Sequence, residues 1–340
     1  MISTEKIDRK ILEEINNLVQ KYEIRPTLID IGASGKPPEI WEDLKHFSRY
    51  IGFDPDSRDI PDTTSLGYWK ADIIDKAVIA GEDDSVDIFL TESPYCSSTL
   101  PPDLDSLKHY AWHDLFIVLG KTKVSAISLP TLITQIDLDR IDWFKTDSQG
   151  IDLRLFLSIP VSIRDHILAV DIEPGLMPAY SGEDFFTHVH ECLIAQGFWL
   201  SNINIGGCPR IHQNSINKIC KTKKPDAWKS CVGAIPYSPY YCEARYFRSI
   251  EWLKSHNAEE RDYLLLCIFA LIDGKTGYAL DVINAYKEKT NDSNIDVLES
   301  TLLHIIREKI QFQKKKFMHF IMNVYSYCMK PIRMILHAGG

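Results

Sequence analysis

Short apolar runs that alternate with polar or helical segments constrain the fold of this 340-residue chain more than any other feature. Five of the six runs have an acidic residue at or near their carboxyl end, and the last run is followed by a predicted helix from about Glu183 to Gln196. Strands that alternate with helices predict an α/β fold with a mostly parallel sheet, which binds ligands at the carboxyl ends of its strands. The runs are TLIDIG at 27–32, YIGFDPD at 50–56, VDIFLTE at 86–92, KVSAISL at 123–129, IDWFKTD at 141–147 and ILAVDIEP at 167–174.

The chain exceeds the usual size of one core, so we expect two regions. An amphipathic helix opens the first, because apolar residues recur there at helical spacing. The second changes to a helical pattern and ends in one long helix. The expected bounds are 1–240 for the α/β domain, 4–22 for its first helix, 28–203 for its core, 241–340 for the helical region and about 296–329 for the last helix.

The net charge and the cysteine content limit the classes of protein to which this chain can belong. With 38 basic against 47 acidic residues the formal charge is -9, which disfavours nucleic acid as a partner. Eight cysteines without a close pair, and no apolar stretch near Met1, argue against a disulfide framework and secretion, so we expect a cytoplasmic protein. We predict no metal site and expect free thiols at the regularly spaced cysteines, because zinc ligands usually come as close pairs. These are Cys208, Cys220, Cys231 and Cys242.

A turn rich in small residues follows the first predicted strand. Glycine at Gly32 and Gly35 lets the backbone approach a ligand and adopt positive φ. Asp54, at the end of the second predicted strand, is placed to bind the hydroxyls of a ribose. The spacing D-x-G-A-x-G, which begins at Asp30 and includes Ala33, differs from a dinucleotide fingerprint and suits S-adenosylmethionine, whose cationic end an acidic residue favours. An ordinary turn in which Asp30 caps backbone amides is the alternative.

In their order along the chain, these pieces resemble the FkbM-type S-adenosylmethionine-dependent methyltransferases. The resemblance covers roughly 28–203, and its most specific element is KTDSQG at 145–150, similar to the family signature Lys-x-Asp-x-(Glu or Gln)-Gly. It implies a class I methyltransferase (Rossmann-like) sheet with helices on both faces, and methyl transfer to a hydroxyl of a sugar, glycan or secondary metabolite. Two positions depart from the family pattern. Lys36 stands where many relatives have glycine. After Gly150 this chain has Ile151-Asp152, where relatives often place a glutamate differently, and this leaves the role of Asp152 open.

Three charged residues near that signature are candidates for catalysis. A hydroxyl is a poor nucleophile until its proton has an acceptor, and Asp147 is the first candidate for that general base. Glu173, after the next strand, is the second candidate. Lys145 is expected to pair with either carboxylate and keep it ionised. A salt-bridged cluster that orders the loops is the alternative.

The last predicted helix is basic in an otherwise acidic chain. Between residues 305 and 333, seven Lys and Arg stand against one Glu, a net charge of +6. Apolar residues such as Ile310, Phe317 and Ile321 share one face, so this helix suits an anionic membrane surface or another protein. The alternative is that its apolar side packs on the helical region.

The sequence therefore predicts a cytoplasmic FkbM-like O-methyltransferase, with possible peripheral contact to a membrane. Two other classes remain open. One is a non-catalytic scaffold in a polysaccharide-assembly complex, and the other is a nicotinamide-dependent oxidoreductase, which the glycine spacing disfavours.

Overall fold

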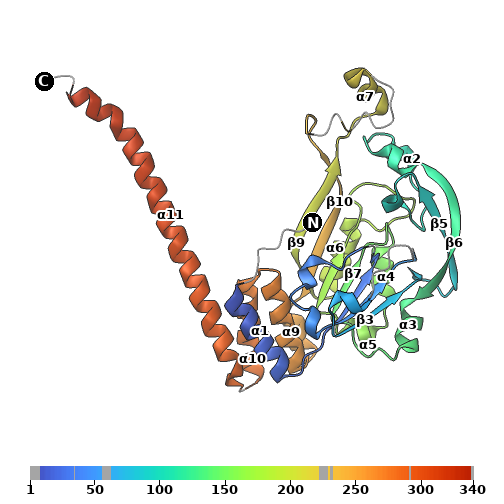
Figure 1. Cartoon of the computed structure of the whole chain (residues 1–340), viewed down its shortest axis with the longest axis horizontal. Coiled ribbons are helices and arrows are strands. Elements are labelled where there is room, and N and C mark those ends of the chain that lie inside the picture. The colour runs from blue at the N-terminus through green and yellow to red at the C-terminus, as the bar shows by residue number, and fades with distance from the viewer. Residues whose placement is uncertain are drawn as a thin grey trace.

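A computed structural model describes residues 8–33, 35–55, 63–221, 229, 233–290 and 292–337, with side chains up to Ile321. A seven-stranded sheet forms its centre (Figure 1). Five neighbouring strands are parallel, and β10 runs antiparallel to both of its neighbours. The order is β3 (Lys70–Ile74), β2 (Arg49–Phe53), β1 (Thr27–Ile31), β7 (Trp143–Thr146), β8 (Ala169–Ile172), β10 (Ser238–Arg248) and β9 (Phe198–Cys208). The predicted α/β fold with a mostly parallel sheet is confirmed.

Two of the predicted strands lie outside that sheet. A separate three-stranded sheet contains β4 (Ala77–Ile79), β6 (Val118–Ser128) and β5 (Ser85–Thr91), in this order. The runs at 86–92 and 123–129 correspond to β5 and β6, which pair antiparallel with each other. Their apolar pattern identifies strands but carries no information about which sheet they join.

Helices cover both faces of the main sheet. One face packs against α3 (Leu129–Gln135), α4 (Asp152–Ser158), α5 (Val161–Arg164) and α6 (Phe186–Ala195). The other packs against α1 (Arg9–Lys21), α9 (Glu260–Ile272), α10 (Thr276–Lys289) and the start of α11 (Asp296–His337). The C-terminal helices thus share an apolar cluster with the sheet, and the sheet itself extends to Arg248, past the boundary expected near Tyr240. The remaining α-helices are α2 (Leu104–Leu107), α7 (Gln213–Cys220) and α8 (Ile250–Ser255).

The described part of the connection between β1 and β2 is built from 3₁₀ turns and not from an α-helix. It contains two 3₁₀ turns, η1 (Glu39–Trp41) and η2 (Lys45–Phe47). The buried side chains of Trp41, Leu44 and Phe47 recur every third residue, which matches the three residues per turn of a 3₁₀ helix. Further 3₁₀ turns are η4 (Thr63–Leu66), η5 (Pro94–Cys96), η6 (His113–Phe116) and η8 (Ser293–Ile295).

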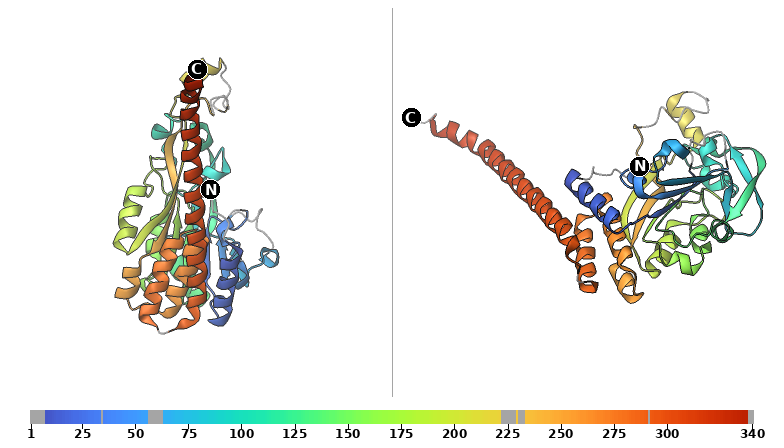
Figure 2. Two further views of the ribbon diagram at one scale, coloured as in Figure 1. Left: turned by 90° about the vertical axis from the view of Figure 1, so that its left-hand side faces the viewer. Right: turned by 60° about the horizontal axis from the view of Figure 1, so that its bottom comes forward.

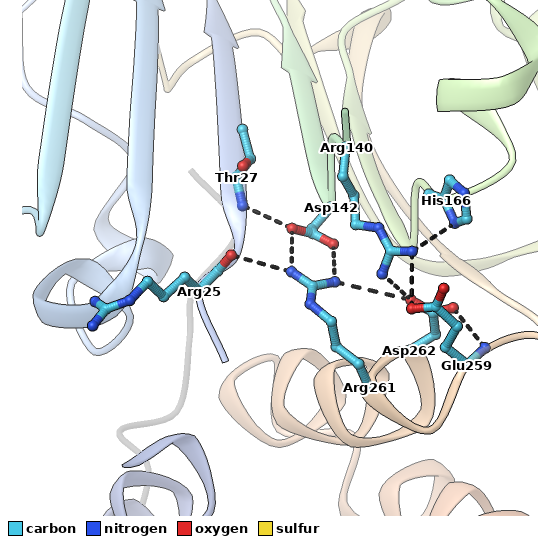
Figure 3. A network of polar contacts seen from close by, with 8 residues as sticks. All are labelled: Arg25, Thr27, Arg140, Asp142, His166, Glu259, Arg261 and Asp262. Carbon is cyan, nitrogen blue, oxygen red and sulfur yellow. Dashed lines mark hydrogen bonds and ion pairs between the residues drawn. The ribbon is translucent and has the colours of Figure 1, made fainter. Parts of the chain in front are cut away.

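An ion-pair network fastens α9 to the amino ends of the central strands (Figure 3). The buried carboxylate of Asp142 accepts hydrogen bonds from the guanidinium of Arg261 at 2.6 and 2.9 Å, and from the backbone amide of Thr27 at 2.7 Å. Arg140 donates to the carboxylates of Asp262 and Glu259 at 3.0 and 3.1 Å. Every buried charge at this junction therefore has a partner, as burial requires.

We expect Asp142→Ala to lower the free energy of unfolding by about 3 kcal/mol, because it removes both short hydrogen bonds that pair the charge of Arg261 and leaves it only the longer contact with Asp262. The value is at the low end of the usual range, since the side chain of Arg261 keeps 25% exposure. Urea denaturation measures the change. Asp105→Ala, which breaks the exposed pair with Lys108, is the matched control and should leave the midpoint unchanged. Equal midpoints for the two variants would contradict this account.

Candidate functional site

Charged residues form two rows across the carboxyl half of the main sheet. The inner row lies on four adjacent strands, where Asp30 pairs in register with Lys145, Lys145 with Asp171, and Asp171 with Arg245. The outer row lies two residues beyond the first three of these positions, at Gly32, Asp147 and Glu173, and at Glu243, which precedes Arg245 by two residues because β10 runs in the opposite direction. Gly32 is its one uncharged member.

The inner row alternates in sign and is joined by hydrogen bonds. The ammonium of Lys145 donates to Asp30 at 2.7 Å, and the guanidinium of Arg245 donates two bonds of 2.7 Å to Asp171. Asp30, 1% exposed, also accepts from the hydroxyl of Tyr50 at 3.0 Å. The sequence prediction that Lys145 pairs with Asp147 or Glu173 was wrong as to the bonded partner, because Asp30 is its neighbour across the sheet.

A cavity of about 1050 Å³ lies over this end of the sheet. Both rows contribute to its lining, including all three carboxylates of the outer row. The opposite wall comes from the β1–β2 connection and from Tyr68, whose ring stacks on Tyr50 with centroids 4.9 Å apart. β1 is also the strand from which the chain continues in both directions across the sheet, and open α/β sheets bind ligands at such a switch point.

The carboxyl groups of the outer row make the cavity acidic, and one of them is protonated at neutral pH. Burial, together with the charges of Asp147 and Glu243, raises the pKa of Glu173 to about 9. Burial also raises the pKa of Asp147, while the ammonium of Lys145 and a hydrogen bond from Gln149 oppose the rise. Burial lowers the pKa of Lys145, but Asp30 and Asp147 outweigh it and raise that pKa overall. At neutral pH Glu173 is therefore protonated and Lys145 is charged.

The turn after β1 and the loop after β7 touch at Gly32. This residue has φ of +81°, and a Cβ on it would lie 2.4 Å from the carbonyl oxygen of Asp147. Its amide and that of Ala33 both donate to the carbonyl of Phe53, at 3.1 and 3.0 Å. Close packing of two backbone segments thus requires Gly32 to be glycine. Gly35, with φ of +83°, is exposed and would meet nothing within 4 Å.

Hydrogen bonds inside the KTDSQG loop fix Asp147. The side-chain amide of Gln149 donates to the Asp147 carboxylate at 2.6 Å, and the hydroxyl of Tyr180 donates to Gln149 at 2.9 Å. Asp152, the first residue of α4, accepts from the Thr146 hydroxyl and the Ser148 amide at 2.8 and 3.0 Å. Through these two hydrogen bonds, Asp152 stabilises the conformation of this loop.

Asp54 is not among the residues that line the cavity. It follows β2, and its backbone amide donates to the carbonyl of Ile74 at 3.3 Å. Burial, followed by the charge and the hydrogen bond of Asp30, raises the pKa of Tyr50, and the charge of Asp54 adds to this rise.

Sequence reasoning missed three of the charged residues in the two rows. Asp171, Glu243 and Arg245 line the cavity with the predicted Asp30, Gly32, Lys145, Asp147 and Glu173. A signal was present in YYCEARYF at 240–247, where two charged residues two positions apart interrupt an apolar run and must share one face of a strand.

Three of the regularly spaced cysteines, Cys208, Cys220 and Cys242, are not among the residues that line this cavity. Cys208 and Cys242 are free cysteines, and Cys231 lies outside the described residues. Within the described part of the chain, no group of three or more His, Cys, Asp or Glu side chains is arranged to hold a metal ion.

No protein-family model matches this sequence, and no curated protein matches it either.

We expect Gly32→Ala to destabilise the protein far more than Gly35→Ala does. Both substitutions place alanine at positive φ, which costs about 1–2 kcal/mol. Gly32→Ala adds the clash with the Asp147 carbonyl, on the order of 2 kcal/mol or more. Thermal and urea unfolding measure the difference. Equal losses of stability in the two variants would mean that the contact between Gly32 and the Asp147 carbonyl does not contribute to the difference.

The pKa of Glu173 predicts a pH dependence of stability. The folded state keeps its proton up to about pH 9, whereas the unfolded chain loses it near the ordinary value of 4.5. The folded state binds more protons in between, so stability falls as pH rises through this range, by at most about 1.4 kcal/mol per pH unit.

Glu173→Gln should flatten that decline, because glutamine does not ionise. Urea unfolding of both proteins between pH 6 and about pH 9, where Glu173 ionises, measures the effect, with the exposed Glu191→Gln as the matched control. Parallel stability curves for wild type and Glu173→Gln would contradict the assignment.

Proposed function

We propose that this chain is an S-adenosylmethionine-dependent methyltransferase acting on a hydroxyl of a sugar, glycan or secondary metabolite. The carboxylates of Asp147, Glu173 and Glu243, gathered in one cavity at the switch point of the sheet, carry the proposal. The reaction class comes from the resemblance to FkbM-type enzymes, and the cavity fits it in three respects.

Sheet topology gives the first support. One part of the sheet consists of β1, β2 and β3, and the other part consists of β7, β8, β10 and β9. In the second part, antiparallel β10 is inserted between β8 and β9. This is the arrangement expected of a class I methyltransferase sheet. Asp30, Gly32 and Asp54 then stand at the ends of the first two strands, where the cofactor of such a sheet binds.

Charge and size give the second support. The cavity volume of about 1050 Å³ is ample for a nucleoside-sized cofactor and part of an acceptor. Carboxylates attract the ammonium and sulfonium groups of S-adenosylmethionine and repel a pyrophosphate. The lining therefore favours this cofactor over a nicotinamide dinucleotide, as the glycine spacing does.

Two buried carboxyl groups in the cavity give the third support. Bound S-adenosylmethionine would supply an activated methyl group. Burial raises the pKa of Asp147 against the opposing effects of Lys145 and Gln149, and a raised pKa strengthens Asp147 as the base that takes the acceptor hydroxyl proton. Glu173 holds a proton at neutral pH and is suited to donate a hydrogen bond to the acceptor.

Calorimetric titration with S-adenosylmethionine tests the proposal, with a nicotinamide dinucleotide as the comparison ligand. We expect micromolar binding of the first and none of the second. Asp54→Ala should weaken binding about tenfold or more, through the loss of hydrogen bonds from the ribose hydroxyls to a carboxylate.

Asp87→Ala is the matched control, because Asp87 is exposed on β5 in the smaller sheet. Asp147→Asn should spare most of the binding and abolish transfer once an acceptor is found. Failure of the folded wild-type protein to bind S-adenosylmethionine would refute the proposal and favour the scaffold function.

A further inference from the structure

The last helix leaves the body of the protein after its first turns. Leu298, Leu302 and Ile305 of α11 are buried in the apolar cluster that contains α1 and α10. From Arg307 to Ile321 every side chain is exposed. The helix then continues outward to His337, and it is seen well clear of both sheets in Figure 1 and in the right view of Figure 2. The expectation that its apolar side packs on the helical region therefore holds only for its first turns.

Large apolar side chains are exposed along the outward part of α11. Phe312, Phe317 and Phe320 keep 65%, 61% and 64% of their surface in solvent. Ile310, Phe317 and Ile321 follow one another at intervals of seven and four residues, so they line one face of the helix. Contiguous apolar surface of this kind on an isolated helix indicates a binding surface.

Basic side chains surround that apolar stripe. Lys314 lies four residues after Ile310 and three before Phe317, so its aliphatic stem runs along the stripe while its ammonium reaches outward. Between 305 and 333 the net charge is +6 in a chain of total charge -9, so the rest of the chain carries -15. The exposed basic residues of this stretch are Arg307, Lys309, Lys314, Lys315 and Lys316.

We propose that α11 from Arg307 onward lies on an anionic lipid surface and holds the protein there. A helix with apolar and basic side chains, both exposed, inserts the first among acyl chains and places the second at anionic headgroups. Within the described part of the chain, no helix has the length and apolar character to cross a bilayer. The contact is therefore peripheral, and it does not depend on the chemistry proposed for the cavity.

Charge favours lipid over the other possible occupants of this surface. Two copies of α11 packed side by side would bring two strongly basic segments together, and like charges at that distance repel. Nucleic acid would satisfy the lysines but leave the phenylalanine and isoleucine side chains in water, because phosphate contacts need only cations.

Vesicle sedimentation of the full chain tests the proposal. We expect binding to vesicles of phosphatidylcholine mixed with phosphatidylglycerol, little binding to phosphatidylcholine alone, and weaker binding as salt rises. A variant with three lysines reversed should bind on the order of a hundredfold more weakly. It carries Lys314→Glu, Lys315→Glu and Lys316→Glu.

Two matched variants separate charge from apolar insertion. Reversal of three exposed lysines outside α11 should leave binding unchanged, and these are Lys108→Glu, Lys123→Glu and Lys218→Glu. Replacement of the apolar stripe by glutamine, which retains helix propensity, should reduce binding at least tenfold although every charge is kept. That variant carries Ile310→Gln, Phe317→Gln and Ile321→Gln, and circular dichroism checks its helix content.

Three results would overturn the proposal. The first is no binding of the wild-type protein to anionic vesicles, and the second is equal loss in the control and α11 lysine variants. The third is a stable oligomer in sedimentation velocity that the glutamine variant dissociates, since this would make the stripe an interface between copies of the chain.

Discussion

A row of alternating charges across four strands is the interaction on which the site depends. Asp30, Lys145, Asp171 and Arg245 lie side by side in register and neutralise one another above the apolar contacts of the sheet. A shift of one residue in any of these strands would turn its charge to the opposite, apolar face. The row therefore fixes strand register. Because its charges neutralise one another, the carboxylates of the outer row need no further cations beneath them.

Local patterns in the sequence were sufficient for the class of fold and insufficient for its topology. The apolar runs at 27–32, 50–56, 141–147 and 167–174 correspond to β1, β2, β7 and β8. β9 and β10 were not foreseen, because polar residues interrupt their apolar pattern. Which strands join which sheet depends on pairing between distant segments, and this left the separate sheet of β5 and β6 undetected.

The sequence identified charged residues of the cavity that follow parallel strands, and it missed those on the antiparallel strand β10. Carboxyl ends of successive parallel strands meet at one edge, so Asp30, Asp147 and Glu173 could be grouped before any coordinates were known. β10 runs in the opposite direction, and Glu243 and Arg245 therefore reach the cavity from within its length. The sequence also could not show which carboxylate pairs with Lys145. Lys145 bonds to Asp30, on a strand more than a hundred residues away in the chain, because the two residues are in register across the sheet.

The contact between Gly32 and the carbonyl of Asp147 limits how this protein could diversify. The two loops meet backbone to backbone, so neither can gain a side chain at that point or shift without the other. The opposite wall of the cavity, which includes Tyr68 and residues of the segment between β1 and β2, takes no part in this contact. Related chains that bind other ligands would be expected to differ in that wall and to keep glycine at the contact.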